Sequence, residues 1–70
     1  MSTIKLPNEL LVQVEKAENF WKMSSLQRLN EVNWCLERCY TNAEEYPEKR
    51  RYMHQQIKEL KRFYNILQGD

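Results

Sequence analysis

The stretch "MHQQIKELKRFYNIL", residues 53–67, has the most regular hydrophobic spacing in the 70-residue chain. Its large apolar side chains recur at alternating steps of four and three residues: Met53, Ile57, Leu60, Tyr64 and Leu67. This spacing places the side chains in one stripe along an α-helix, and such a stripe packs against other helices. The stretch therefore predicts an all-α fold with a helix over residues 47–67.

Two prolines mark where helices begin. Proline is tolerated in the first turn of a helix because its missing N–H would have no intrahelical partner there. Pro47 therefore opens the helix over 47–67, and Pro7 opens an earlier one. The segment after Pro7 has its own apolar stripe, at steps of four, three and four residues: Leu10, Val14, Ala17 and Trp21. This pattern predicts a first helix over residues 7–22.

A capping pattern predicts the helix between them. Ser24 is followed three residues later by Gln27, a capping box in which each side chain satisfies a backbone N–H of the other residue. The apolar side chains of this helix fall within about 140° of arc: Leu29, Val32, Cys35, Leu36, Cys39 and Tyr40. A residue before proline is disfavoured in the α region, so the helix should end before Tyr46. We expect it over residues 25–44.

Short connections between these helices favour antiparallel neighbours. The chain is predicted to be a single helical domain over residues 1–70, and two arrangements stay open. One is a small three-helix bundle, and the other is a long helical hairpin with a short N-terminal helix laid across it. A chain of this length buries only about 60 % of its unfolded surface, so its stability alone is marginal. We therefore expect help from a partner, a metal, disulfides or self-association, and among these we predict a homodimer.

The composition indicates a folded chain with a polar, solvated surface. Hydrophobic residues make up 41 % of the chain and charged residues 30 %, and the mean hydropathy is −0.87. No run approaches the roughly 18 to 20 apolar residues of a membrane span, and the N-terminus lacks the apolar core of a secretory signal. Two cysteines are too few for a disulfide framework and fit a reducing compartment. We expect a cytoplasmic protein with no membrane partner.

The thiols of Cys35 and Cys39 share one helix face because they are four residues apart. Their β-carbons should lie about 5 to 6 Å apart, whereas a disulfide needs about 3.5 to 4.5 Å. A structural zinc site needs four ligands, and the chain adds only His54 and carboxylates to the thiols. We interpret the cysteines as small apolar core residues and predict no metal or cofactor. A redox or metal role is the alternative.

Trp34 should project away from the predicted core stripe of its helix. It lies about 160° around the helix from Val32. Other large apolar side chains also fall outside the three stripes: Val12, Phe20, Tyr52, Phe63 and Ile66. Exposed aromatic surface is typical of interfaces, so we predict a second apolar surface for a dimer or a partner. A bundle whose helices are buried on two faces would instead absorb some of these side chains.

Basic side chains gather on one side of the helix over 47–67. They fall within about 120° of arc: Arg51, Lys58, Lys61 and Arg62, with Arg50 and His54 at the edge. Such a stripe suits the phosphates of nucleic acid or an acidic protein surface. The sequence pI of about 7.8 is below the value above 9 that is typical of nucleic-acid-binding domains. Nucleic-acid binding is therefore the second hypothesis.

Catalysis is not expected, because nucleophile, base and orienting group cannot be assembled from this chain. Its only histidine is His54 and its only aspartate is Asp70. The sequence predicts a non-enzymatic interaction module, an adaptor, inhibitor or assembly factor, that binds a larger protein. Aromatic and cationic side chains are the predicted contacts: Trp34, Phe20, Tyr52, Phe63, Arg51, Lys58 and Arg62. The alternative is a small nucleic-acid-binding regulator that uses the basic side of the helix over 47–67.

Overall fold

The computed structural model describes residues 6–13 and 17–69, and within these ranges the fold is all-α, with no strand. Two short helices, α1 (Asn8–Gln13) and α2 (Ala17–Lys22), precede the long helix α3 (Ser25–Glu45). A 3₁₀ turn, η1 (Pro47–Lys49), then leads into the second long helix, α4 (Arg50–Gly69). The predicted all-α fold class is confirmed.

The capping box fixes the start of α3 as the sequence predicts. The backbone N–H of Gln27 donates to Ser24 Oγ at 3.2 Å, and the backbone N–H of Ser24 donates to Gln27 Oε1 at 3.2 Å. At the other end, Tyr46 leaves the helical region with φ −125° and ψ 86°, as expected for a residue before proline. Helix α3 therefore ends at Glu45, one residue beyond its predicted end.

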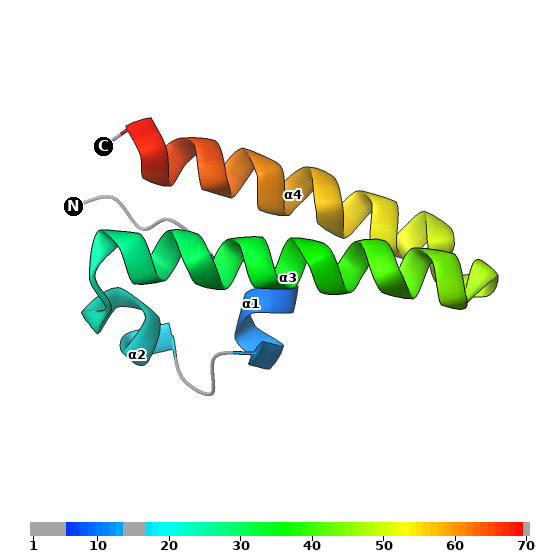
Figure 1. The fold of residues 1–70 in the computed structure, drawn as a ribbon, viewed down its shortest axis with the longest axis horizontal. Coiled ribbons are helices and arrows are strands. Elements are labelled where there is room, and N and C mark those ends of the chain that lie inside the picture. Colours follow the sequence, from blue (N-terminus) through cyan, green and yellow to red (C-terminus); the bar gives the residue numbers. More distant parts are fainter. Residues whose placement is uncertain (1–5, 14–16, 70) are drawn as a thin grey trace.

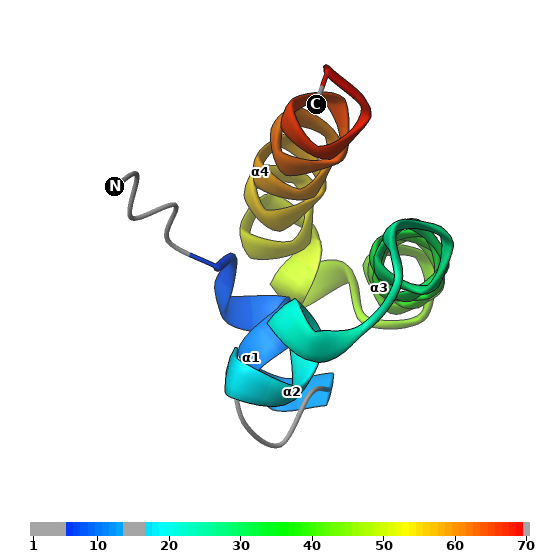
Figure 2. The same cartoon turned by 90° about the vertical axis from the view of Figure 1, so that its left-hand side faces the viewer.

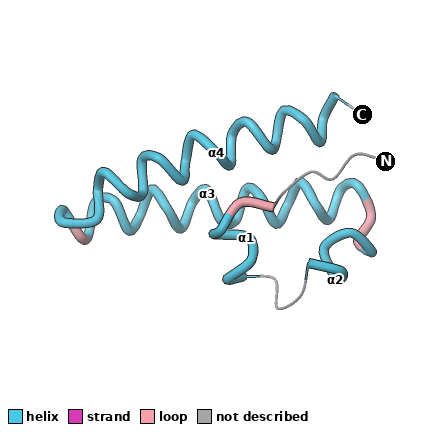
Figure 3. Tube along the Cα trace, turned by 180° about the vertical axis from the view of Figure 1, so that it is seen from behind, coloured by secondary structure: helices cyan, strands magenta, loops and turns pink. Residues whose placement is uncertain are grey.

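Helices α3 and α4 form a long antiparallel hairpin, and α1 and α2 lie on one side of it (Figures 1 and 2). The two long helices lie closest near η1 and diverge towards the C-terminal end of α4, in views from the front and from behind (Figures 1 and 3). The molecule measures 38 × 22 × 19 Å. Of the two predicted arrangements, the hairpin with N-terminal helical structure laid across it describes this fold.

The single helix predicted over residues 7–22 is wrong, because the structure has two short helices, α1 and α2, in this region. Leu10 belongs to α1 and Phe20 to α2. As parts of two helices, both side chains are fully buried, with 0 % exposure. Val14 of the predicted stripe lies outside the described residues.

The core is built where α1, α2, α3 and α4 meet. Its buried apolar side chains come from all four helices and from the segment before α1: Leu6, Leu10, Phe20, Val32, Cys35, Cys39, Ala43, Met53, Ile57, Leu60 and Phe63. Four further apolar side chains pack against it and stay partly exposed: Met23, Leu36, Tyr64 and Leu67. The stripe that the spacing predicts for α4 therefore faces the core, as do Val32, Cys35 and Cys39 of the stripe predicted for α3. Tyr40, predicted on that same stripe, is instead 46 % exposed.

Phe20 and Phe63 were expected outside the core as contact residues, and this placement is wrong, because both are buried. Their ring centroids lie 5.8 Å apart, so Phe63 of α4 packs against α2. Helix α4 thus buries one stripe against α3 and a second one, with Phe63 and Gln56, on the side of the N-terminal helices. Trp21, expected on the buried stripe, lies at the edge instead and is 37 % exposed.

Candidate interaction surface

Exposed basic side chains recur along α4 on the side away from the core. Helical periodicity places Arg51, Lys58 and Arg62 about 160° to 200° around α4 from the fully buried Leu60. We call the exposed basic side chains of this helix the basic face: Arg50, Arg51, His54, Lys58, Lys61 and Arg62. The predicted cationic side chains therefore share one exposed surface.

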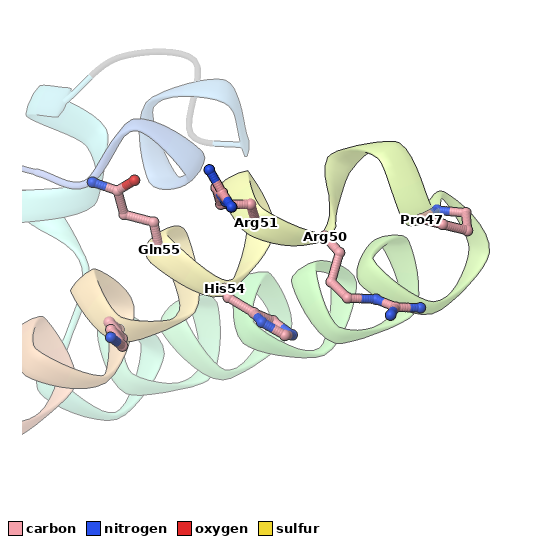
Figure 4. A pocket seen from close by; sticks show the side chains of 6 residues that line it. Pro47, Arg50, Arg51, His54 and Gln55 are labelled. Carbon is pink, nitrogen blue, oxygen red and sulfur yellow. The ribbon is translucent and has the colours of Figure 1, made fainter.

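The first turns of α4 form an open groove of about 720 Å³ within the basic face. Figure 4 shows Arg50 and His54 on one side of the helix and Arg51 and Gln55 on the other. The groove is lined by one proline and five polar or cationic residues: Pro47, Arg50, Arg51, His54, Gln55 and Lys58. Three full positive charges therefore flank a groove that is open to solvent.

Charge is unevenly divided between the two long helices. Helix α4 carries five lysine and arginine side chains and one carboxylate, that of Glu59. Helix α3 carries two arginines and four glutamates. Glu59 lies towards the N-terminal segment, where it lines a separate groove with Leu6, Pro7 and Arg62. The basic face therefore has no carboxylate of α4 in its centre, and a negatively charged partner meets an uninterrupted positive surface.

Trp34 is exposed as predicted, at 50 %, but it lies on α3 and not beside the basic face of α4. The guanidinium carbon of Arg38 lies 5.3 Å from the centroid of its ring, a cation–π contact. These two residues line a shallow depression with Glu37, Thr41 and Asn42. Trp34 and Arg38 thus form a second, smaller candidate surface on α3.

Tyr52 is also exposed as predicted, at 47 %, on the side of α4 that faces α1. Partial burial raises the pKa of its hydroxyl, and the negative charge of Glu9 in α1 adds to this effect. The structure therefore leaves Tyr52 between the basic face and α1. Of the four aromatic contact residues predicted from the sequence, only Trp34 and Tyr52 are exposed, and they do not share a surface.

Two further cation–π contacts were not predicted from the sequence. Lys61 Nζ lies 5.7 Å from the ring centroid of Tyr40, which joins α4 to α3. Lys49 Nζ lies 5.2 Å from the ring centroid of Tyr46. The pair of Trp34 and Arg38 has the four-residue spacing of helical neighbours and could have been found from sequence. The contact between Lys61 and Tyr40 depends on helix pairing and could not.

The two thiols lie in the core, which confirms the interpretation of Cys35 and Cys39 as core residues. The Cys35 thiol donates to the backbone carbonyl of Glu9 at 3.8 Å, which attaches α3 to α1. Burial, followed by the negative charge of Glu31, raises the pKa of Cys35 to about 12. Burial and the charge of Glu9 raise the pKa of Cys39 to about 11. Both thiols are therefore protonated and weakly nucleophilic at neutral pH.

Within the described ranges, no three His, Cys, Asp or Glu side chains gather closely enough to hold a metal ion. The same part of the chain contains no helix with the length and apolar character needed to cross a membrane. Comparison with known proteins adds no relative: no family model matches the chain, and no match was found among curated proteins or solved structures.

Proposed function

We propose that this protein is a small non-enzymatic interaction module of the cytoplasm, which uses the basic face of α4 to bind an acidic surface on a larger protein. Binding would alter the activity or the fate of that partner. The observation that carries the proposal is the run of six exposed basic side chains on one side of a helix whose opposite side is buried. Complementary charge of this kind speeds association and selects partners.

Two features favour a protein over nucleic acid as the partner. The basic face extends from residue 50 to residue 62, which corresponds to about 18 Å of helix. The adjacent α3 has more carboxylates than cations, and the pI of the chain is only about 7.8. A long phosphate backbone would meet repulsion beyond this short stripe, whereas a single acidic helix or loop would not.

Affinity capture with matched charge reversals tests this proposal. The variant Lys58→Glu/Arg62→Glu reverses two charges in the basic face, and Lys22→Glu/Lys49→Glu reverses two exposed lysines outside it. Both variants carry the same net charge, so a difference between them reflects the position of the charges. We expect the natural chain and the control to retain the same partner, at a level that falls with salt, and the basic-face variant to lose it. Equal capture by the two variants would refute the proposal.

Nucleic-acid binding is the second candidate, because the groove between Pro47 and Lys58 combines arginines, a lysine and a histidine. Such a groove suits phosphate oxygens. This candidate predicts binding of duplex DNA or RNA that weakens steeply as salt rises, and loss of binding in Arg51→Glu/Lys58→Glu/Arg62→Glu. Failure of the natural chain to bind either duplex at low salt would eliminate it.

A further inference from the structure

The hairpin of α3 and α4 has two sides, and the described N-terminal helices cover only one of them (Figure 2). On the covered side, Arg28 of α3 donates to the backbone carbonyls of Phe20 at 3.4 Å and Trp21 at 2.7 Å. The Cys35 thiol donates to the carbonyl of Glu9 on the same side. No described residue outside the hairpin packs on the opposite side, which we call the open side.

Tyr40 identifies which side chains belong to the open side. It lies about 140° around α3 from Cys35, which faces α1, and Lys61 of α4 lies over its ring. Tyr40 is 46 % exposed, and Leu26, near the start of α3, is 67 % exposed. The apolar side chains of α3 on this side follow heptad spacing, with Asn33 at the one polar position: Leu26, Leu29, Leu36 and Tyr40. Such spacing is the pattern that another helix recognises.

The rims of the open side carry opposite charges. Helical periodicity places Glu37 and Glu44 on the α3 rim, and Arg50 and Lys61 on the α4 rim. All four side chains are exposed. A surface with an acidic helix beside a basic helix is complementary to a copy of itself when it is turned about a two-fold axis along the hairpin. That rotation lays α3 of each copy against α4 of the other.

We propose that a second copy of this chain docks on the open side, so that α3 and α4 of two molecules form a four-helix core. Each α3 lies against the partner's α4, with the carboxylates of one rim opposite the cations of the other. The short helices α1 and α2 remain on the outside. The alternative dimer that pairs α3 with α3 would oppose like charges, which is unfavourable.

The size of the open side fits a dimer of modest stability. Helix α4 has 20 residues, which makes it about 30 Å long, and two helices at ordinary spacing are about 20 Å wide. Each copy therefore presents roughly 600 Å², which is at the lower end of the range for specific interfaces. The dimer should consequently dissociate on dilution, and its contacts should be sensitive to the charges on the rims.

Sedimentation equilibrium with charge exchange tests this dimer. We expect the natural chain to reach twice its 8.6 kDa mass as concentration rises. The variants Glu37→Lys/Glu44→Lys and Arg50→Glu/Lys61→Glu should each dimerise at least about tenfold more weakly, because each opposes like charges. An equimolar mixture of the two should dimerise again, because its two α3 to α4 contacts both pair opposite charges. A chain that stays at 8.6 kDa, or a mixture that fails to associate, would overturn the proposal.

A matched control separates the effect of charges on the rims from the effect of net charge. Glu48→Lys/Glu59→Lys has the same net charge as Glu37→Lys/Glu44→Lys, but Glu48 is in η1 and Glu59 lies beside Leu6 and Pro7 of the N-terminal segment. This control should therefore dimerise like the natural chain. Circular dichroism on every variant verifies that the helices remain. Partner capture is compared in Glu37→Lys/Glu44→Lys, which keeps all six side chains of the basic face, because Arg50→Glu/Lys61→Glu reverses two of them. A monomer that still captures the acidic partner would overturn the dimer and leave the proposed function intact.

Discussion

At the scale of single residues, burial controls the chemistry of Cys35 and Cys39. Their raised pKa values, about 12 and about 11 against 9.0 for a free thiol, leave very little thiolate at neutral pH. Alkylation by iodoacetamide at pH 8 should therefore be at least about a hundredfold slower in the folded chain than in urea, as measured by mass spectrometry. Rapid labelling of either thiol in the folded chain would show that it is accessible and that its pKa is ordinary.

The same pKa values predict how stability depends on pH. Above pH 9 the unfolded chain loses thiol protons that the folded chain still holds. The free energy of unfolding should therefore fall as the pH rises from 9 towards 11. Below pH 8 the thiols are protonated in both states, so they should not make the free energy of unfolding depend on pH. Denaturant titrations over this range should show a shallower fall for Cys35→Ala/Cys39→Ala than for the natural chain. Parallel curves would contradict the raised pKa values.

Gln56 is a buried polar residue with an unsatisfied group. Its side chain is 4 % exposed, and within the described residues Oε1 has no hydrogen-bond partner. Replacing it by leucine removes the cost of burying that oxygen, so Gln56→Leu should raise the free energy of unfolding by about 1 kcal/mol in urea titrations. The neighbouring Gln55 is exposed, and Gln55→Leu should change stability little. A marked loss of stability in Gln56→Leu would indicate that the amide makes a needed hydrogen bond.

Truncation to alanine should lower the stability of the fold much more at Phe63 than at Trp34. Phe63 is 3 % exposed and packs against Phe20 and Trp21 at centroid distances of 5.8 and 6.3 Å. Phe63→Ala should therefore cost about 3 to 5 kcal/mol, most of the stability that a domain of this size has. Trp34→Ala should cost less than about 1 kcal/mol, because half of the indole is already exposed. Thermal unfolding of the two variants compares these costs directly.

The sequence predicts which side chains are buried only where a helix has a single apolar stripe facing the core. Val32, Cys35 and Leu60 follow the strongest periodicity of their helices, and all are buried. Phe63 belongs to a second stripe on α4, which is buried because α2 brings Phe20 against it. Nothing in the spacing within α4 shows where α2 will lie, because that position depends on contacts between segments far apart in the chain.

At the scale of helices, the capping box at Ser24 sets the junction between α2 and α3. Its hydroxyl oxygen accepts the backbone N–H of Gln27 at 3.2 Å. Ser24→Ala removes this acceptor and should cost about 1 kcal/mol in urea unfolding. Ser25, the first residue of α3, is also exposed and makes no capping bond. Ser25→Ala should therefore leave stability nearly unchanged, and equal effects of the two changes would contradict the assigned cap.

Helix boundaries could be predicted where local chemistry determines them. Ser24, Gln27 and Pro47 act within a few residues of their own positions, and α3 begins and ends within one residue of its predicted limits. The region before α3 could not be predicted in the same way, because its apolar residues also fit one continuous helical stripe. In the structure α1 and α2 are separate helices that bury Leu10 and Phe20 in the shared core, an arrangement that involves segments far apart in the chain.

At the scale of the whole molecule, charge is separated between the two long helices, and this separation carries both proposals. Arg51, Lys58 and Arg62 project outward, which leaves them free for an acidic partner. The basic face could be predicted from the sequence because it lies within one helix, where periodicity is sufficient. The distance between that face and Trp34 could not, because it depends on how α3 packs against α4.

Residue-resolved NMR titration with an acidic probe tests the central claim, that the basic face of α4 is the binding surface, most directly. A polyglutamate peptide serves as the probe, duplex DNA as the comparison, and Lys58→Glu/Arg62→Glu as the matched variant. We predict that the peptide shifts signals between Arg50 and Arg62, that the shifts shrink as salt rises, and that the variant loses them. Shifts centred on Trp34 and Arg38, or no shifts at low salt, would contradict the claim.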